Sequence, residues 1–183
     1  MIATIVAIDS NYGIGSKGKL LTHIPEDMKM FKELTTNNVV VMGRKTYESL
    51  PKKPLPNRTN IIITSQKETY PCFDNVNNNV VYEDMEGAKL FLSCFEKIKV
   101  IYDTDVRDRD VYVIGGGQIY KELLPFCERV YITKIFHAYD NVDTYFPNID
   151  NMLEWEMTSA SEVKEHNGIK YQFCVYNRVM CER

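Results

Sequence analysis

The sequence predicts an α/β protein, a three-layer sandwich whose central sheet is largely parallel and ends in an antiparallel C-terminal strand. Residues 2–8, 39–42 and 60–64 are apolar at nearly every position and rich in β-branched side chains. Such runs are typical of strands buried on both faces. Amphipathic segments with helical spacing alternate with these runs, and that alternation favours a parallel sheet with helices on both faces.

The remaining elements continue this alternation. Further strands are predicted at residues 80–82, 111–114 and 130–135, and helices at residues 25–34, 44–50, 85–98 and 118–124. Residues 155–160 and 171–179 are expected to pair as antiparallel strands around the turn Asn167-Gly168. Residues 13–24 are expected to form a mobile loop and residues 66–80 a surface loop, whereas residues 99–110 could be a strand extension or a loop.

Length and composition restrict the class of protein. At 183 residues, the chain is expected to form one domain, residues 1–183. A net charge of −3 argues against nucleic-acid binding, and no apolar run approaches the length of a membrane span. The five cysteines are odd in number and contain no Cys-x-x-Cys pair, and Met1 leads directly into a strand, so we expect a cytoplasmic protein. The three histidines lack metal-like spacing, so no metal site is assigned.

Asp27 is the strongest candidate for a functional carboxylate. It lies in the first turn of the predicted helix, beside an apolar face formed by Ile24, Met28, Phe31 and Leu34. A carboxylate in apolar surroundings needs hydrogen-bond donors, because an unpaired buried charge is costly. Acids are also common in a first turn simply because they satisfy free backbone amides and complement the helix dipole. The position alone leaves both interpretations open.

Two strand–glycine–helix turns could bind phosphate, Met42-Gly43-Arg44-Lys45-Thr46 and Ile114-Gly115-Gly116-Gly117-Gln118-Ile119-Tyr120. Free amides at such turns attract anions, and glycine lets the backbone come close. Neither turn matches the G-x-G-x-x-G fingerprint or a P-loop, and a glycine at a strand end often serves turn geometry alone. Two of them in one small α/β protein indicate a dinucleotide that lies across the sheet edge.

In this order along the chain, these pieces resemble the dihydrofolate reductase family over nearly the whole length. The matching segments are Ile5-Val6-Ala7, Ile14-Gly15, Pro25-Glu26-Asp27-Met28 with Phe31-Lys32, Met42-Gly43-Arg44-Lys45-Thr46 with Glu48-Ser49, Pro54-Leu55-Pro56-Asn57-Arg58, Val113-Ile114-Gly115-Gly116-Gly117, Thr133, and Asp143-Thr144 with Phe146-Pro147. The resemblance implies a dihydrofolate-reductase-like fold, and an aspartate at position 27 resembles the bacterial or phage type.

The resemblance implies an oxidoreductase that uses NADPH to reduce 7,8-dihydrofolate to 5,6,7,8-tetrahydrofolate, in support of one-carbon metabolism and thymidylate synthesis. A hydride would go to C6 of the substrate and a proton, with water as its donor, to N5. Asp27 would accept hydrogen bonds from the 2-amino and N3 groups of the pterin and orient the ring, supported by Thr133. Leu20 and Thr22 complete the implied catalytic set.

The resemblance also implies two sets of binding residues. The substrate set is Ile5, Val6, Asp27, Met28, Phe31, Lys32, Ser49, Leu50, Leu55, Arg58, Ile114, Tyr120 and Thr133. The cofactor set is Ala7, Ile14, Gly15, Gly18, Lys19, Leu20, Gly43, Arg44, Lys45, Thr46, Thr64, Ser65, Ile114, Gly116, Gly117, Gln118, Ile119, Tyr120 and Thr144. Arg58 would grip the glutamate α-carboxylate of the substrate. Arg44, Thr64 and Ser65 would hold the adenosine 2′-phosphate, which favours NADPH over NADH, and residues 13–24 would act as a lid.

Three features depart from the family pattern. Leu21-Thr22 stands where most members carry Pro-Trp, which bears on rate and antifolate affinity, because Thr22 can hold a water but supplies no indole surface. Gln118 stands where an arginine often helps to bind the 2′-phosphate. Residues 66–110 form a longer region than in compact bacterial members, and this region has no assigned function.

The expected ligands are dihydrofolate or folate and antifolates, bound by a monomer without nucleic-acid or membrane partners. Two alternatives to a dihydrofolate reductase stay open. One is a reductase of another heterocycle in the same fold, such as the pyrimidine-ribose-phosphate reductases of riboflavin synthesis. The other is a non-catalytic NADPH- or folate-binding module, such as a structural component of a virion, in which the missing tryptophan signals lost turnover.

Overall fold

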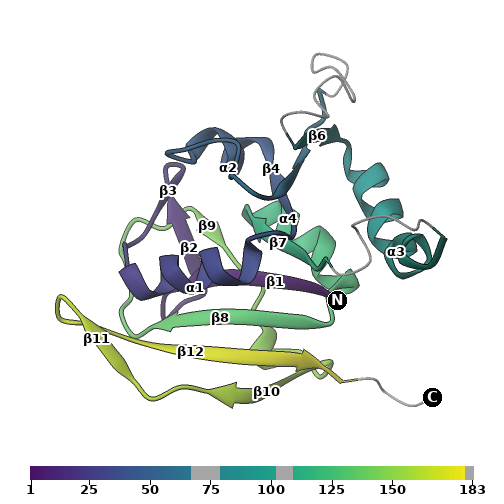
Figure 1. Cartoon of the computed structure of the whole chain (residues 1–183). Helices are drawn as coiled ribbons and strands as arrows, with labels where there is room; N and C mark the ends of the chain where they lie inside the picture. Colours follow the sequence, from purple (N-terminus) through teal and green to yellow (C-terminus); the bar gives the residue numbers. More distant parts are fainter. Residues whose placement is uncertain (67–78, 102–108, 180–183) are drawn as a thin grey trace.

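A mixed β-sheet forms the centre of the computed structural model, which describes residues 1–66, 79–101 and 109–179 (Figure 1). The strands of this sheet are β1 (Ile2–Ile8), β4 (Val39–Gly43), β5 (Thr59–Ile63), β6 (Val80–Glu83), β7 (Val111–Gly115), β8 (Arg129–Ile135), β10 (Trp155–Ala160), β11 (Lys164–His166) and β12 (Ile169–Arg178). Their order is β10-β12-β8-β1-β7-β4-β5-β6, and β11 also pairs with β12. From β6 to β8 all neighbours are parallel, whereas β12 pairs antiparallel with β8, β10 and β11. The predicted sheet is therefore confirmed.

Helices cover both faces of this sheet, as a three-layer sandwich requires. On one face α1 (Pro25–Thr35) and α2 (Arg44–Ser49) pack against a cluster that contains Ala3, Ile5 and Met42. On the other face α3 (Met85–Ile101) and α4 (Gly117–Leu123) pack against a larger cluster that contains Ile2 and Val6. Alternate residues of β1 thus enter opposite cores, which is why this strand is apolar at every position except Thr4.

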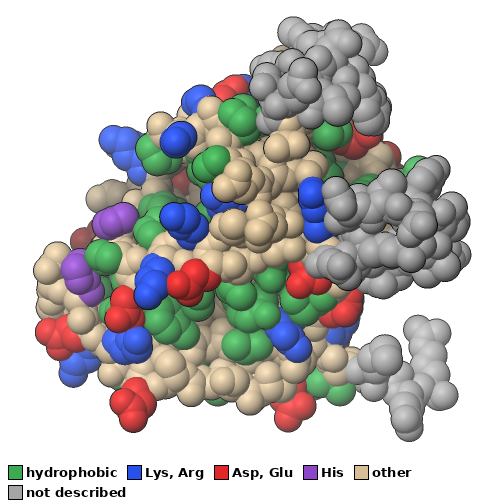
Figure 2. All heavy atoms as spheres, in the orientation of Figure 1, with side chains coloured by type: hydrophobic (Ala, Val, Ile, Leu, Met, Phe, Trp, Pro, Cys, Tyr) green, Lys and Arg blue, Asp and Glu red, His purple; other side chains and the backbone are tan. Residues whose placement is uncertain are grey.

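Helix α1 begins at Pro25, which suits the first helical position, and ends where the Thr36 N–H bonds to the Lys32 carbonyl. Phe31 and Leu34 pack against the sheet as predicted, and Met30, which the spacing did not indicate, joins them. Ile24 is buried in a third cluster with Ile135 and Tyr171. Figure 1 shows that α1 lies in front of β1 and β8 and leaves β12 uncovered, and apolar side chains are visible on this face below the helix (Figure 2).

The prediction of an irregular loop at residues 13–24 is wrong for its first part. Strands β2 (Gly13–Ser16) and β3 (Lys19–Leu20) form a hairpin, and β9 (Thr144–Tyr145) pairs with β2 in a second small sheet. The two turn residues between β2 and β3 have positive φ angles, 50° at Lys17 and 75° at Gly18, which is the conformation that two-residue hairpins require. Strands this short carry no readable alternation of apolar and polar residues.

Two further predictions need correction. The turn Asn167-Gly168 joins β11 to β12, so β10 reaches its partner β12 through an additional strand rather than through this turn. Helix α3 continues to Ile101, so the alternative of a strand at Val100 and Ile101 is wrong. Most of the predicted loop at residues 66–80, and residues 102–108 of the ambiguous segment, lie outside the described residues. Among the residues that are described, no helix is long and apolar enough to cross a membrane.

Candidate active site

Asp27 lies in the first turn of α1 with its side chain turned toward the sheet. Its residue is only 8% exposed, and Oδ1 accepts a hydrogen bond of 2.5 Å from the hydroxyl of Thr133, which is fully buried on β8. The helix begins without a side-chain cap. The carboxylate therefore bonds to a strand remote in sequence, not to the free amides of its own helix, which argues against a simple capping role.

The surroundings of Asp27 favour the neutral carboxyl group. Burial raises its pKa, and the Thr133 hydrogen bond and the charge of His23 only partly oppose that shift. In the part of the chain that the structure describes, Thr133 supplies the one hydrogen bond to this carboxylate, and Oδ2 has no donor. Because an ionised carboxylate accepts several hydrogen bonds, Asp27 keeps unused capacity for a ligand that carries N–H groups.

Tyr120 of α4 lies close to this carboxylate. Its hydroxyl donates a 2.9 Å hydrogen bond to the carbonyl of Ile5 and is buried. Burial and the nearby charge of Asp27 both raise the pKa of Tyr120, so its hydroxyl remains protonated at neutral pH. This bond ties α4 to the strand that runs beside Thr133, and Ala7 of that strand pairs with Thr133.

An apolar wall extends from Asp27 along the same face of the sheet. Four half-buried side chains pack against the cluster of Ile5 and Met42, and they come from α1, from the end of α2, from the loop after it and from β7. They are Phe31, Leu50, Leu55 and Ile114. The structure thus brings together most of the apolar residues predicted for the substrate, in an arrangement that suits a flat aromatic ligand.

Arg58 lies beyond this wall as a buried cation. Its residue is 6% exposed, and its guanidinium donates to the Thr35 hydroxyl at 2.8 Å and to the Pro56 carbonyl at 3.0 Å. The guanidinium carbon lies 5.9 Å from the centre of the Phe31 ring, and burial lowers the pKa of Arg58. It forms no ion pair with any described residue. A buried cation without a counter-charge is stabilised by an anionic ligand.

The two glycine-rich turns form one continuous edge, because β4 and β7 are neighbours and Met42 pairs with Gly115. A Cβ on Gly43 would lie 3.0 Å from Ile119, and one on Gly116 would lie 3.3 Å from the Thr46 hydroxyl. Gly115 has a φ of 132°, which disfavours other residues. The glycines therefore keep this edge open beside Thr46, and these residues fit a pyrophosphate held by backbone amides and a hydroxyl.

The residues predicted for the 2′-phosphate lie at the neighbouring strand ends, since Gly43 of β4 pairs with Ile63 of β5. Arg44 follows Gly43 and pairs with Glu48 at 2.6 Å. Thr64 is buried, and its hydroxyl accepts a hydrogen bond from the amide of Gln66. Three other predicted positions are solvent-exposed, Lys45, Ser65 and Gln118.

Some predicted substrate residues lie apart from the wall. The side chain of Val6 packs in the core on the opposite face, so only its backbone faces this region. Lys32 and Ser49 are exposed, and the Ser49 hydroxyl donates to the carbonyl of Thr46. Met28 is half-buried. The sequence did not distinguish these positions, because their strands and helices were predicted without their orientation.

The β2–β3 hairpin carries Ile14, Gly15, Gly18, Lys19 and the 62% exposed Leu20, and Thr22 follows it half-buried. Asp143, to which the sequence assigned no role, holds this hairpin. Its Oδ2 accepts a 2.6 Å hydrogen bond from the Lys17 amide, and its own amide donates to the Gly15 carbonyl at 3.2 Å. The only sequence signal for it was the segment Asp143-Thr144.

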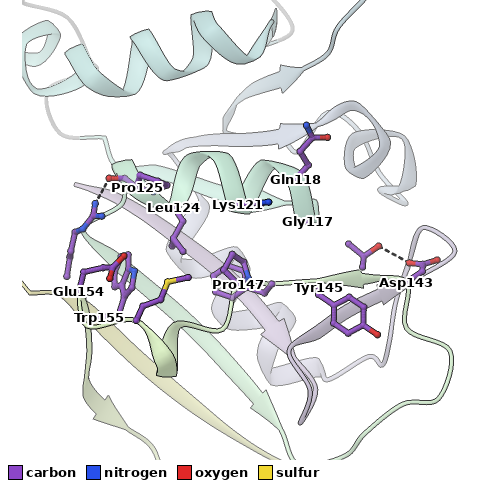
Figure 3. Close-up of a pocket in the computed structure, with 14 residues that line it drawn as sticks. Gly117, Gln118, Lys121, Leu124, Pro125, Asp143, Tyr145, Pro147, Glu154 and Trp155 are labelled. Atoms are coloured by element: carbon purple, nitrogen blue, oxygen red, sulfur yellow. Dashed lines mark hydrogen bonds between the residues drawn. The ribbon is translucent and has the colours of Figure 1, made fainter.

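A separate groove of about 650 Å³ lies between α4, β9 and the start of β10 (Figure 3). Gly117 and Gln118 lie at one end of it, and Glu154 and Trp155 lie at the other end. It does not include Asp27. Of the two ends, only the one at Gly117 adjoins the sheet edge formed by the two glycine-rich turns. A Cβ on Gly117 would lie 2.9 Å from Thr144 there.

A largely parallel sheet with two glycine turns at one edge and a buried carboxylate beside an apolar wall fits the class of α/β oxidoreductases that bind a nucleotide cofactor. The family model "Dihydrofolate reductase" matches residues 1–178. Dihydrofolate reductase of Bacillus subtilis is 33% identical over 180 residues, covering 97% of this chain and 95% of that protein. Dihydrofolate reductase of Schistosoma mansoni is 35% identical over 191 residues, covering 94% of each. The chain belongs to the dihydrofolate reductase family.

Plant relatives include the same unit in a longer protein. The bifunctional dihydrofolate reductase-thymidylate synthase of Daucus carota is 38% identical over 188 residues, which cover 96% of this chain and 33% of that protein. The chain therefore spans about a third of the plant protein and nearly the full length of the monofunctional relatives. These matches argue against the alternative of a riboflavin-pathway reductase.

Proposed function

We infer that the site around Asp27 and Thr133 carries the dihydrofolate reductase activity of this chain. The protein is an oxidoreductase that reduces 7,8-dihydrofolate to 5,6,7,8-tetrahydrofolate and uses NADPH as its cofactor. The observation that supports this site most directly is the buried Asp27 carboxylate, whose second oxygen has no donor in the described chain and which borders an apolar wall.

Asp27 binds and orients the pterin ring. The 2-amino and N3 groups of a pterin present two N–H donors side by side, which match the two oxygens of a carboxylate. The Thr133 hydroxyl holds one of these oxygens from the β8 side, so the carboxylate has a defined direction before a ligand arrives. Such preorganisation places the reacting carbon with little further loss of freedom.

The chemistry at the substrate needs no protein nucleophile. NADPH, when bound, supplies the hydride that C6 of dihydrofolate accepts. The chain positions the ring through Asp27 and excludes water with apolar side chains such as Phe31 and Ile114. The proton at N5 is donated by water, and Asp27 promotes this step through its effect on the pterin.

Arg58 binds the α-carboxylate of the glutamate tail at the far end of the wall. The support for this role is its burial, its lack of an ion pair with the part of the chain that the structure describes, and its position beside Phe31. Two hydrogen bonds already fix its guanidinium, so little side-chain freedom is lost on binding. A charge-assisted hydrogen bond of this kind contributes about 1.5–3 kcal/mol.

NADPH binds along the glycine edge. Lys45, Thr46, Gly116 and Gly117 hold the pyrophosphate, supported by the close approach of Gly116 to Thr46. The adenosine 2′-phosphate is held by three residues at the neighbouring strand ends, Arg44, Thr64 and Ser65. Ala7 and residues 13–24 cover the nicotinamide, and these residues act as a lid, of which the β2–β3 hairpin, residues 13–20, is the part that lies over the ring.

The activity is tested by following NADPH absorbance with and without dihydrofolate. We expect oxidation that requires dihydrofolate, and Asp27→Asn should lower kcat/KM about 100-fold or more while the far-ultraviolet circular dichroism stays unchanged. Glu26→Gln is the matched control, because Glu26 is an acid of the same helical turn whose carboxylate bonds instead to Lys164 and Tyr171. An Asp27→Asn variant as active as the parent would remove Asp27 from the reaction.

The same experiments separate the alternatives. Oxidation with a pyrimidine-ribose-phosphate substrate and not with dihydrofolate would indicate the other reductase. Calorimetric binding of NADPH or folate without turnover would indicate a non-catalytic module. We also propose that the chain is a single-domain, cytoplasmic monomer that antifolates inhibit, which sedimentation and inhibitor titration test.

A further inference from the structure

A polar cluster lies on the face of the sheet opposite to α1, centred on Asp150 of the short helix η3 (Ile149–Asn151). The carboxylate of Asp150 accepts hydrogen bonds of 2.5 Å from the Tyr12 hydroxyl, 2.5 Å from the Tyr176 hydroxyl and 2.8 Å from the Lys134 ammonium. These donors come from the segment after β1, from β12 and from β8. We call these four residues the Asp150 cluster.

The Asp150 cluster keeps one protonation state around neutral pH. Burial raises the pKa of Asp150, but the hydrogen bonds from Lys134, Tyr12 and Tyr176 outweigh it, and the pKa lies below its usual range. Burial, followed by the bond to Asp150, raises the pKa of both tyrosines. The hydroxyls therefore remain donors and the carboxylate remains an acceptor, so the cluster is a permanent connection rather than a pH switch.

Tyr12 connects the Asp150 cluster to the β2–β3 hairpin. It directly precedes Gly13, the first residue of β2, and its φ of 64° lies in the left-handed region that bulky residues rarely adopt. Its carbonyl accepts a 2.8 Å bond from the Phe146 amide and its amide donates to the Asp9 carbonyl at 3.1 Å. A conformation of this kind persists only where the surroundings determine it from several directions.

Lys134 connects the Asp150 cluster to the substrate side. It follows Thr133 on β8, and consecutive residues of a strand face opposite sides of the sheet. Thr133 points to Asp27 on the α1 face, while Lys134 points to Asp150 on the other. The base of the hairpin is therefore fastened to the strand that positions the catalytic carboxylate.

We propose that Tyr12, held by Asp150, is a positioning residue that sets the orientation of the β2–β3 hairpin over the nicotinamide of NADPH. This proposal rests on the lid role given to residues 13–20 above. Tyr12 acts through the backbone that it fixes, because its hydroxyl bonds to Asp150 on the face remote from Asp27. Loss of that hydroxyl frees the start of β2 and leaves the pterin side of the site intact.

Tyr176 provides a matched control, because its hydroxyl bonds to the same carboxylate at the same distance but its strand does not lead into the hairpin. Tyr12→Phe should raise the Kd of NADPH, measured by fluorescence, about five-fold and leave the Kd of dihydrofolate within two-fold of the parent. Tyr176→Phe should leave both Kd values within about two-fold. Thermal unfolding should shift slightly more in Tyr12→Phe, because the Tyr12 hydroxyl also accepts a 3.3 Å hydrogen bond from the Asp150 amide, whereas Tyr176→Phe loses the bond to the carboxylate alone.

Equal NADPH affinity in the two phenylalanine variants would overturn the proposal and leave the Asp150 cluster with a purely structural role. Asp150→Asn provides the second variant, should Tyr12→Phe not fold, and it should also weaken NADPH more than dihydrofolate. An unchanged NADPH Kd in a folded Asp150→Asn protein would again overturn it. Turnover of the parent protein with dihydrofolate is measured in a separate assay, and a failure of the proposed reaction would appear in that assay. The comparison of NADPH Kd values between the variants reports on the hairpin alone.

Discussion

Thr133→Val isolates the contribution of one hydrogen bond to the acidity of Asp27. Valine keeps the branched shape of threonine at a fully buried position, so the change is confined to the hydroxyl that donates to Asp27 at 2.5 Å. A hydrogen bond to a charged group contributes about 1.5–3 kcal/mol. Its loss should therefore raise the pKa of Asp27 further above its already raised value.

The sign of the stability change follows from linkage. Because burial raises the pKa of Asp27, the folded protein binds this proton more tightly than the unfolded chain. This proton therefore stabilises the folded state. The stabilisation is complete below the pKa that Asp27 has in the unfolded chain, and it is lost as the pH rises to the pKa that Asp27 has in the folded protein. In Thr133→Val that loss should continue to a higher pH than in the parent protein, because the pKa of Asp27 is raised further. Thermal unfolding across the acidic and neutral range and the carboxyl chemical shift of Asp27 measure it.

Thr133→Ser is the control, because it keeps the hydroxyl and removes only a methyl group. It should lower the unfolding free energy by about 1 kcal/mol at every pH, as a small cavity does, without a change in the pKa of Asp27. Dihydrofolate binding, which uses the ionised carboxylate, should weaken at neutral pH in the valine variant alone. An unchanged Asp27 pKa in Thr133→Val would refute the idea that Thr133 holds this carboxylate.

Three further changes test the other parts of the site. Arg58→Met should weaken dihydrofolate binding about 10- to 100-fold without affecting NADPH, in calorimetric titrations, because it removes a buried cation. Gly117→Ala should weaken NADPH at least about ten-fold, since its Cβ would lie 2.9 Å from Thr144. The Lys17 amide and the Thr144 hydroxyl hold the pKa of Asp143 below its usual range, so its bond to the hairpin persists at neutral pH and is lost as the pH falls through that lowered pKa. Asp143→Asn should therefore weaken NADPH about three-fold at neutral pH and abolish the acid dependence of its binding.

The parallel part of the fold was predictable because its strands are buried on both faces. Residues 2–8 are apolar except at Thr4, and residues 111–114 are apolar throughout, which is typical of strands buried on both faces. The β2–β3 hairpin was missed for the opposite reason. It pairs only a few residues, and its glycines and lysines are as typical of an irregular loop as of a tight turn.

The candidate site was predicted as a set of residues without its connections. The sequence indicated Asp27 as a charged group beside apolar positions, the order of the motifs indicated the family, and only that resemblance implied a role for Arg58. It contained no signal that Tyr12 and Asp150 are in contact, because 138 positions separate them and neither lies in a recognisable motif. Contacts of this kind form only when the strands are assembled.

The sequence by itself determined the class of fold, because local composition and periodicity are carried by each segment alone. The order of its motifs gave the resemblance to a family, and that resemblance implied residues for binding a pterin and a dinucleotide. Only the tertiary structure decided that Asp27 bonds to Thr133, that Arg58 is buried without a counter-charge among the described residues, and that two separate glycine turns meet at one edge. The physical reason is that burial and hydrogen-bond partners are properties of packed elements, so they are set by which strands become neighbours.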